Sequence, residues 1–161
     1  ARPFQVWKFR TMIVDADRYL DESGRATRSR LTRVGRFLRK SSLDELPQLI
    51  NIARGEMSLV GPRPAAMEHL PRYTDEQERR FRMKPGVTGL AQVNGRNTLM
   101  WSERIRLDNE YIDGYSLALD AKILWRTVGV VARREGIATD RNPDEVDDLG
   151  PPRPGIADEE G

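Results

Sequence analysis

Apolar side chains recur at three- and four-residue intervals over most of the chain, the spacing that places them on one face of an α-helix. This pattern predicts helices over residues 7–21, 28–40, 75–83, 102–112 and 117–134. Short apolar runs bounded by glycine or a turn occur at residues 57–60 and 87–93. We expect a strand at the first run and a strand or extended loop at the second. The pattern predicts a single compact α+β domain, rich in short amphipathic helices with a few short strands.

One more helix is expected within residues 41–55, where the sequence reads SSLDELPQLINIARG. Its apolar positions have helical spacing, and Pro47 restricts where the helix can begin. With Asp44 as the N-cap, Pro47 falls at the third helical position, where no intrahelical N–H is needed. We therefore predict that Asp44 caps this helix and that Glu45 lies in its first turn.

The composition excludes several classes of site. The 161 residues contain no cysteine, which rules out disulfides, zinc–thiolate centres and thiol nucleophiles. The one histidine, His69, is expected at the surface and cannot form a histidine-rich metal cluster. No apolar run approaches the roughly 18 residues that a bilayer-spanning helix needs.

The net charge of +2 conceals two unlike parts. Residues 138–161 contain eight acidic and two basic side chains, which leaves 17 acidic and 25 basic in residues 1–137. We expect residues 1–137 to form the folded domain and residues 138–161 a disordered acidic tail, because the tail has few large apolar residues. The chain enters its first periodic segment abruptly, so we expect the natural protein to begin earlier. The basic surface of the domain favours anionic partners.

Asp44 and Glu45 are two adjacent carboxylates that admit two interpretations. The first is purely structural, because acidic residues stabilise the N-terminus of a helix. The second is chemical: one carboxylate can attack phosphorus as a nucleophile, and its neighbour can hold a divalent cation through oxygen. The dipeptide alone favours the structural interpretation.

The Gly61–Pro64 turn, Gly-Pro-Arg-Pro, offers a second candidate for phosphate chemistry. Prolines on both sides fix the backbone around Arg63, which suits bidentate binding of phosphate. A rigid surface turn with a solvated arginine is equally compatible with the residues. Further cations cluster around the glycine turns at residues 79–96, where backbone N–H groups can approach an anion; a solvated basic face is the alternative.

Two classes of function follow from these features. The first is an enzyme acting on a pyrophosphate, with the acid pair as its chemical groups. The alternative is a basic non-enzymatic module that binds anionic lipid or nucleic acid, which the charge of residues 1–137 allows. No RNA-stacking aromatic signature or DNA-binding helix pair is recognisable, so nucleic acid is not the expected partner.

Six ordered segments together resemble the bacterial sugar transferase family, the monotopic phosphoglycosyl transferases. The segments are KFRTM (8–12), TRVGRFLRK (32–40), SLDELPQL (42–49), MSLVGPRP (57–64), PGVTGLAQVNGR (85–96) and LDNEYIDGYSLALDAKIL (107–124). The resemblance covers about residues 7–136 and the catalytic domain only, without the upstream re-entrant membrane helix of the family. Leu90 stands where many members have tryptophan.

The resemblance implies transfer of a phosphosugar from a nucleotide-activated sugar, usually a UDP-sugar, to polyprenyl phosphate. Such a reaction is a first membrane step of bacterial surface glycan assembly, as in exopolysaccharide or lipopolysaccharide biosynthesis. It takes place at the cytoplasmic face of the inner membrane, whose anionic surface is an expected partner. A homo-oligomer is left open.

The resemblance also assigns roles to residues. It implies that Asp44 attacks the β-phosphate, releases UMP and carries the phosphosugar until polyprenyl phosphate displaces it. Glu45 would help to hold Mg²⁺, and Arg63 would neutralise phosphate charge. Arg39, Arg80 and Arg96 match basic positions of the family motifs and are expected in the substrate pocket.

Overall fold

The computed structural model describes residues 2–19, 30–95, 98–133 and 147–153. The described α-helices are α1 (Arg33–Ser41), α2 (Gln48–Ala53), α3 (Asp75–Glu78), α4 (Leu90–Asn94), α5 (Trp101–Asp113) and α6 (Leu117–Arg133). The described 3-10 helices are η1 (Ala16–Tyr19), η2 (Leu43–Glu45), η3 (Met67–Arg72) and η4 (Arg79–Arg82). The two described strands are β1 (Ser58–Val60) and β2 (Gly86–Thr88). The helix-rich α+β fold predicted from the sequence is confirmed.

The two strands form a small parallel sheet at the centre of the domain. Ser58 pairs with Gly86 and Val60 with Thr88. Parallel strands need a long crossover connection, and η3, α3 and η4 provide it. The glycines allow this close approach: a Cβ at Gly86 would lie 2.2 Å from the backbone nitrogen of Gly61. The sheet thereby brings the end of β1 and the end of β2 to one place.

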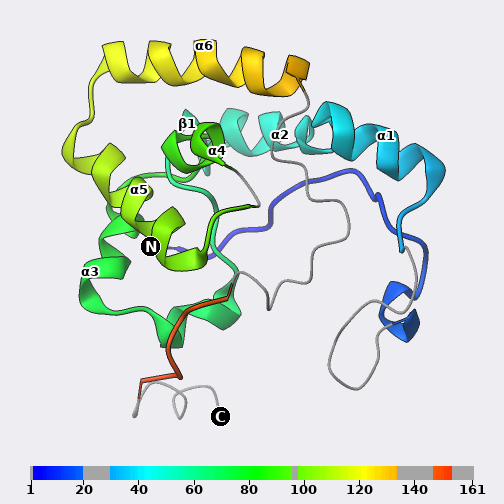
Figure 1. Cartoon of the computed structure of the whole chain (residues 1–161), viewed down its shortest axis with the longest axis horizontal. Coiled ribbons are helices and arrows are strands. Elements are labelled where there is room, and N and C mark those ends of the chain that lie inside the picture. The colour runs from blue at the N-terminus through cyan, green and yellow to red at the C-terminus, as the bar shows by residue number, and fades with distance from the viewer. Residues whose placement is uncertain (1, 20–29, 96–97, 134–146, 154–161) are drawn as a thin grey trace.

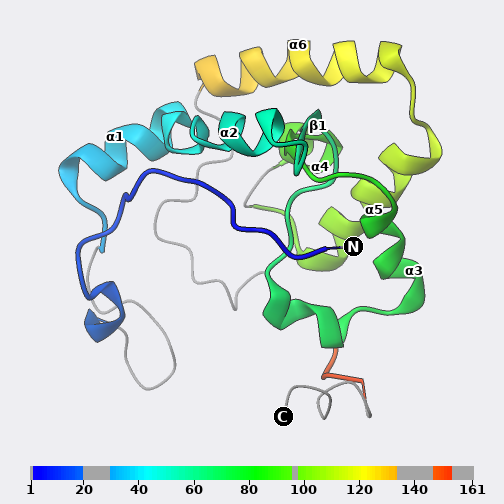
Figure 2. The same ribbon diagram turned by 180° about the vertical axis from the view of Figure 1, so that it is seen from behind.

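Two apolar clusters form the core. Val60, Val93, Tyr111 and Ile123 are buried together and join β1, α4, α5 and α6. In both views α6 lies above the row formed by α1 and α2, while the N-terminal segment runs below that row (Figures 1 and 2). The second cluster contains Tyr73, Ile105 and Leu149, with Phe81 and Trp101 against it.

The N-terminal segment is the largest departure from the sequence prediction. A helix was expected over residues 7–21, but residues 2–15 are not helical and η1 is the single helical turn described there. The segment hydrogen-bonds to distant parts of the chain instead: Phe9 N–H donates to the Asp44 carbonyl at 3.0 Å and Trp7 N–H to Asn51 Oδ1 at 3.1 Å. These long-range bonds override the local helical periodicity.

Most of the other predicted elements are present, with shifted ends. Helix α1 begins at Arg33, because Thr32 caps it by accepting from Gly35 N–H at 2.8 Å. Residues 87–93 divide between β2 and α4, since Gly89 interrupts them with a fully extended backbone. Helices α5 and α6 correspond closely to their predictions, and the charged helix predicted over residues 75–83 is present as α3 followed by η4.

The acidic tail was expected to be disordered, and for Asp147–Arg153 that expectation is wrong. Asp147 binds Arg72 through two hydrogen bonds, and Leu149 is 8% exposed within the second core cluster. Arg153 N–H donates to the Pro71 carbonyl at 2.8 Å. The sequence prediction overlooked that one leucine and three charged side chains suffice to fix a short segment. We call these seven residues the C-terminal strap (Figure 1); the remainder of residues 138–161 lies outside the described ranges.

Candidate functional site

A cavity of about 550 Å³ opens between the N-terminal segment, η2, the Gly61–Pro64 turn and the helices α4, α5 and α6. Five of the six predicted site residues line it: Arg39, Asp44, Glu45, Arg63 and Arg80. The sixth, Arg96, lies outside the described residues. Segments that are distant in sequence therefore meet at one site.

Asp44 and Glu45 lie in η2, one turn before α2, and Asp44 is not the N-cap of an α-helix. Helix α2 begins at Gln48 with Pro47 as its N-cap. The physical reason is that Ser42 adopts a left-handed backbone, with φ of 56°, which ends α1 and directs the chain into η2. In addition, the Asp44 carbonyl accepts the N–H of Phe9 rather than an intrahelical donor. The two carboxylates thus occupy a tight turn at the cavity.

The electrostatic environment of Asp44 is mixed. Burial raises the pKa of the Asp44 carboxyl, and the neighbouring charge of Glu45 raises it further. The cations of Lys8 and Arg39 oppose this rise and lower the pKa. A partly desolvated carboxylate of this kind is a stronger base and nucleophile than an exposed one.

Glu45 is held by two cations from distant segments. Arg63 Nη2 lies 3.0 Å from Glu45 Oε1, and Lys8 Nζ lies 3.7 Å from the same oxygen. The Glu45 side chain is only 17% exposed, so these contacts are partly shielded from solvent. The acid pair and the arginine turn, which were separate candidates in the sequence, are therefore in direct contact.

Hydrogen bonds fix the Gly61–Pro64 turn where β1 ends. Gly61 N–H donates to the Thr88 carbonyl at 2.9 Å, and Gly86 N–H donates to the Pro62 carbonyl at 2.8 Å. Gly61 and Pro62 are buried, whereas the Arg63 side chain is one-third exposed. The turn is anchored in the sheet and presents its guanidinium at the cavity.

Arg80 also lines the cavity, but most of its guanidinium is engaged by protein groups. It is 2% exposed and pairs with the equally buried Asp108, with 2.6 Å between Nη2 and Oδ2. It also donates to the Arg63 carbonyl at 2.8 Å and to the Tyr73 hydroxyl at 3.2 Å. Burial raises the pKa of Asp108 to about 6, against the lowering influence of Arg80 and Arg63.

Arg39 and Lys8 complete the cationic side of the site. Arg39 Nε donates to Thr11 Oγ1 at 3.0 Å, which ties α1 to the N-terminal segment. Burial lowers the pKa of Lys8, and the nearby charge of Arg63 lowers it further, while Glu45 and Asp44 oppose that shift. Lys8 was absent from the residues predicted for the site. Its place in the KFRTM segment was the available signal, but that segment was expected to be helical.

Three more polar or aromatic residues line the cavity and were not predicted. Gln92 is 8% exposed, and neither polar atom of its amide has a hydrogen-bond partner among the described residues. The Arg104 guanidinium lies 4.8 Å from the Trp101 ring centre, and its Nε donates to the Leu99 carbonyl. His69 was expected at the surface, but its ring packs against Trp101, with 4.8 Å between the two ring centres.

Apolar side chains also line the cavity. They come from η2 and α2, from β2 and α4, and from the end of α6, and include Leu46, Leu49, Val87, Ala91, Val130 and Val131. The cavity therefore has both charged and apolar lining residues, and this combination suits a ligand that has both an anionic and a lipid-like part.

A resident metal site made by the protein alone is not found in the described ranges. No group of three or more His, Cys, Asp or Glu side chains there is arranged to hold an ion. Mg²⁺, however, is commonly held by one or two carboxylates together with phosphate oxygens of the substrate. The pair Asp44 and Glu45 fits that second kind of site.

Comparison with known proteins agrees with the geometry. The family model described as bacterial sugar transferase matches residues 1–134. The "Uncharacterized sugar transferase EpsL" of Bacillus subtilis is 49% identical over 138 residues, covering 84% of this chain and 66% of the relative. The UDP-galactose-lipid carrier transferase of Erwinia amylovora is 44% identical, and the undecaprenyl-phosphate galactose phosphotransferase of Salmonella typhimurium is 43% identical.

The chain spans only 31% of the length of each of these last two relatives, and 84% and 83% of the chain is covered in the respective matches. The match to the family model, over residues 1–134, nevertheless includes each of the cavity segments described above, from the N-terminal segment to α6. This chain belongs to the bacterial sugar transferase family.

Proposed function

We propose that this chain is the catalytic part of a phosphoglycosyl transferase that moves a phosphosugar from a UDP-sugar to polyprenyl phosphate. The observation that carries the proposal is the meeting of Asp44 and Glu45 with Arg63 and Lys8 at a cavity that apolar side chains also line. The names of the relatives, which include a UDP-galactose-lipid carrier transferase and undecaprenyl-phosphate phosphotransferases, support the same substrate classes.

The proposed reaction has two displacements at one phosphorus atom. An Asp44 carboxylate oxygen attacks the β-phosphorus of the donor, the bond from that phosphorus to the bridging oxygen breaks, and UMP leaves with that oxygen. A phosphate oxygen of the acceptor then attacks the same phosphorus and the bond to Asp44 breaks. The products are the polyprenyl diphosphosugar and free Asp44. A covalent relay of this kind divides one difficult transfer into two easier steps.

The surrounding charges provide positioning and neutralisation, which are the main demands of phosphoryl transfer. Arg63 would bind donor phosphate oxygens with its fork of N–H groups, and Lys8 and Arg39 would keep Asp44 ionised. Glu45 is the residue that would hold Mg²⁺. The cation would then replace Arg63 or Lys8 as the partner of the Glu45 carboxylate. Bound there, the cation would offset the negative charge of the diphosphate.

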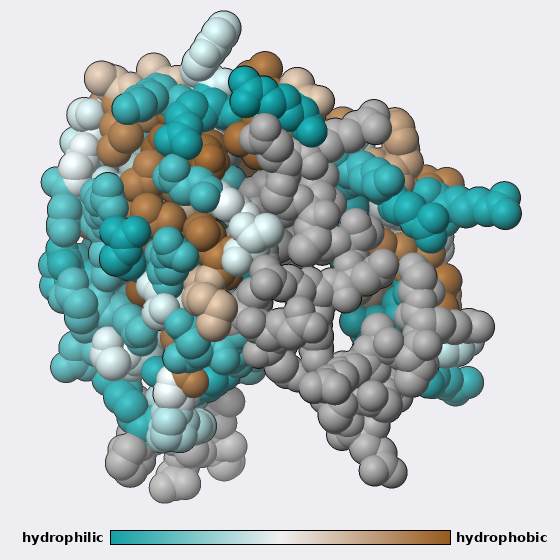
Figure 3. All heavy atoms as spheres, in the orientation of Figure 1, coloured by the Kyte–Doolittle hydropathy of each residue, from teal (hydrophilic) through white to brown (hydrophobic). Residues whose placement is uncertain are grey.

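The acceptor and the membrane are proposed to meet the apolar side of the molecule. Large side chains are exposed on α6 and α1, among them Trp125, Val128, Val34 and Phe37 at 80%, 66%, 68% and 59% exposure. Apolar atoms are visible over the upper part of the molecule, where α6 lies, between charged side chains (Figure 3). In the described ranges, no helix combines the length and apolar character needed to cross a bilayer. We propose peripheral contact with the cytoplasmic face of the inner membrane.

The test is a panel of UDP-sugars assayed with polyprenyl phosphate in detergent micelles, with release of UMP as the readout. One or more donors should give UMP release that requires both polyprenyl phosphate and Mg²⁺, and Asp44→Asn should abolish it. Glu110→Gln is the matched control, because Glu110 is an exposed carboxylate on α5 that binds Arg106. Failure of every UDP-sugar, or full activity of Asp44→Asn, would reject the proposal.

A further inference from the structure

Arg80 and Asp108 form a buried ion pair whose presence calls for an explanation. Their side chains are each 1% exposed, and 2.6 Å separates Arg80 Nη2 from Asp108 Oδ2. A buried pair has a large desolvation cost, and apolar residues of similar volume often stabilise a fold equally well or better. Stability alone is therefore a weak reason for this pair, and its neighbours indicate another one.

The pair holds the backbone of one particular residue. Arg80 Nη2 donates to the Arg63 carbonyl at 2.8 Å. Burial raises the pKa of Asp108, and the charges of Arg80 and Arg63 both lower it. Arg80 thus binds the Arg63 carbonyl, and Asp108 in turn holds Arg80 by accepting a hydrogen bond from the same guanidinium nitrogen, at 2.6 Å. We call Arg80 and Asp108 together the buried clamp.

A third residue fixes the orientation of Arg80 within the clamp. The Tyr73 hydroxyl accepts a hydrogen bond from Arg80 Nη1 at 3.2 Å, and the Tyr73 ring centre lies 5.7 Å from the guanidinium carbon. Tyr73 is fully buried in the second core cluster. The clamp therefore connects the Gly61–Pro64 turn to the rigid core between η3, η4 and α5.

The Arg63 side chain is directed the other way, into the cavity. Its guanidinium contacts Glu45 at 3.0 Å, while its backbone is held by the clamp. Pro62 and Pro64 restrict the backbone on both sides. An arginine with a fixed backbone has less freedom to lose when it grips a diphosphate, which is how preorganisation improves binding and rate.

We propose that Arg80 and Asp108 are positioning residues that set the Arg63 guanidinium for the donor diphosphate without touching the substrate themselves. The inference deepens the proposed function and rests on it. It replaces the expectation that Arg80 binds substrate directly, and it assigns a role to Asp108, which the sequence analysis did not single out.

The first test is a double-mutant cycle on kcat/KM for sugar-phosphate transfer, which measures whether the clamp acts through Arg63. Arg63→Ala alone should lower kcat/KM about ten- to a hundred-fold, the effect of losing one charge-assisted contact. Asp108→Asn should cause a similar loss in the native background. In the Arg63→Ala background, Asp108→Asn should cost less than about threefold, because little of its effect can remain.

Asp120→Asn is the matched control for this cycle. Asp120 accepts a hydrogen bond from the Tyr111 hydroxyl at 2.7 Å within the same α5–α6 region but is not among the residues that line the cavity. It should lower Tm while changing kcat/KM per folded molecule by less than about threefold. Equal losses from Asp108→Asn in both Arg63 backgrounds would overturn the proposal.

A second variant separates positioning from folding, because breaking a buried pair can unfold a domain. Arg80→Met combined with Asp108→Leu replaces the pair by apolar side chains and should regain most of the Tm lost by the single variants. We expect kcat/KM per folded molecule to stay at least about tenfold low, since Arg63 has lost its anchor. Native kcat/KM in this folded double variant would show that the clamp is merely structural.

Binding of inorganic pyrophosphate with Mg²⁺, measured by calorimetry, is a readout that does not need turnover. Arg63→Ala and the folded clamp variants should weaken this binding by similar factors, and Asp120→Asn should not. If the native chain turns over no UDP-sugar but shows this binding pattern, the proposed function fails and the clamp stands. If the native chain is active and clamp variants bind pyrophosphate normally, the clamp fails and the function stands.

Discussion

At the scale of residues, the acid pair and the arginine turn could be predicted as separate motifs, because their residue types already suit phosphate chemistry. Their contact could not, since Glu45 and Arg63 are brought together by the end of a parallel sheet and a left-handed Ser42. Lys8 and Asp108 escaped prediction for a related reason. Their roles depend on partners that are distant in sequence, Glu45 for Lys8 and Arg80 for Asp108, and a single sequence does not reveal such pairs.

The pH dependence of activity should report the environment of Asp44. The proposed nucleophile must be ionised, and its pKa is raised by burial and by Glu45. Activity should therefore fall, as pH decreases, through a pKa above the ordinary aspartate value. Glu45→Gln removes the like charge and should move this acid limb to lower pH, whereas Lys8→Met removes an opposing cation and should move it to higher pH.

The measurement is kcat/KM against pH for the native chain and the two variants, at fixed ionic strength. Glu110→Gln, far from the pair in sequence and exposed on α5, should leave the limb in place. Limbs that coincide in all four proteins would mean that a group of the substrate, rather than Asp44, titrates.

At the scale of elements, helices with strong apolar periodicity and no competing partners were predicted well, as α5 and α6 show. The N-terminal segment had similar periodicity but is extended, because its N–H groups bind the backbone of Asp44 and the side chain of Asn51. Periodicity in a single sequence cannot reveal such long-range partners. The close crossing of this segment over α1 has one specific requirement, the absence of a side chain at Gly35.

Gly35→Ala should destabilise the domain. A Cβ at position 35 would lie 1.9 Å from the carbonyl oxygen of Thr11, a contact that forces the N-terminal segment to move. Overpacking of this kind costs about 1–3 kcal/mol, and the displaced Thr11 would also lose its bond to Arg39. We expect a Tm lower by several degrees and reduced transfer activity.

Gly129→Ala is the matched control within a helix. Its added Cβ meets no described atom within 4 Å in the interior of α6. Alanine is favoured over glycine there by about 0.5–1 kcal/mol, so Tm should stay the same or rise. A native Tm for Gly35→Ala would show that the segment does not cross α1 as described.

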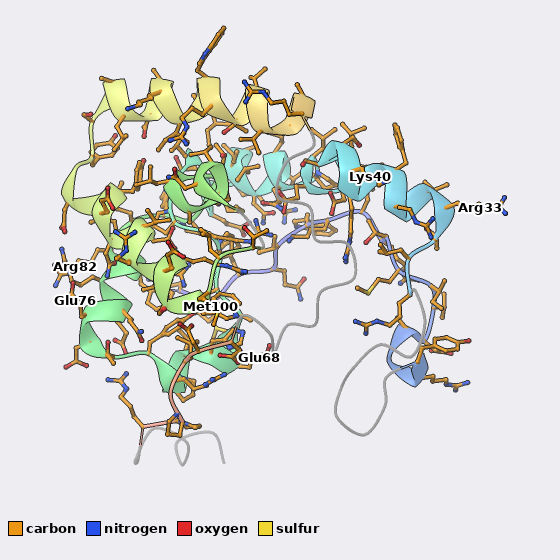
Figure 4. The ribbon with its side chains drawn as sticks, in the orientation of Figure 1. Arg33, Lys40, Glu68, Glu76, Arg82 and Met100 are labelled. Carbon is orange, nitrogen blue, oxygen red and sulfur yellow. The ribbon has the colours of Figure 1, made fainter. Side chains whose placement is uncertain are left out.

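At the scale of the whole molecule, charged side chains lie both on α1 and on the α3–η4 region. Arg33 at the start of α1 and Arg82 at the end of η4 lie at opposite sides of the molecule, while Glu76 projects near Arg82 (Figure 4). The C-terminal strap contacts the acidic side chains of α3, because Arg153 pairs with Asp75 and Glu78. It also caps α5 from outside, because Asp148 accepts the Ser102 N–H at 2.9 Å.

Deletion of residues 147–161 should therefore lower stability, contrary to what composition alone suggests. Burial of a leucine such as Leu149 contributes about 1.5–3 kcal/mol, and about 1 kcal/mol corresponds to 2–4 °C in a domain of this size. Tm should fall by several degrees in a thermal unfolding experiment. Deletion of residues 154–161 alone keeps every described strap contact and should change Tm little; equal Tm values for all three chains would contradict the strap.

The central claim is that Asp44 becomes covalently attached to the phosphosugar, and intact-protein mass spectrometry tests it most directly. The chain is incubated with Mg²⁺ and an accepted UDP-sugar, without polyprenyl phosphate, and quenched. We expect a mass increase equal to one phosphosugar, located on Asp44. It should be lost on addition of polyprenyl phosphate and be absent in Asp44→Asn. Turnover without any such adduct, together with activity in Asp44→Asn, would contradict the central claim.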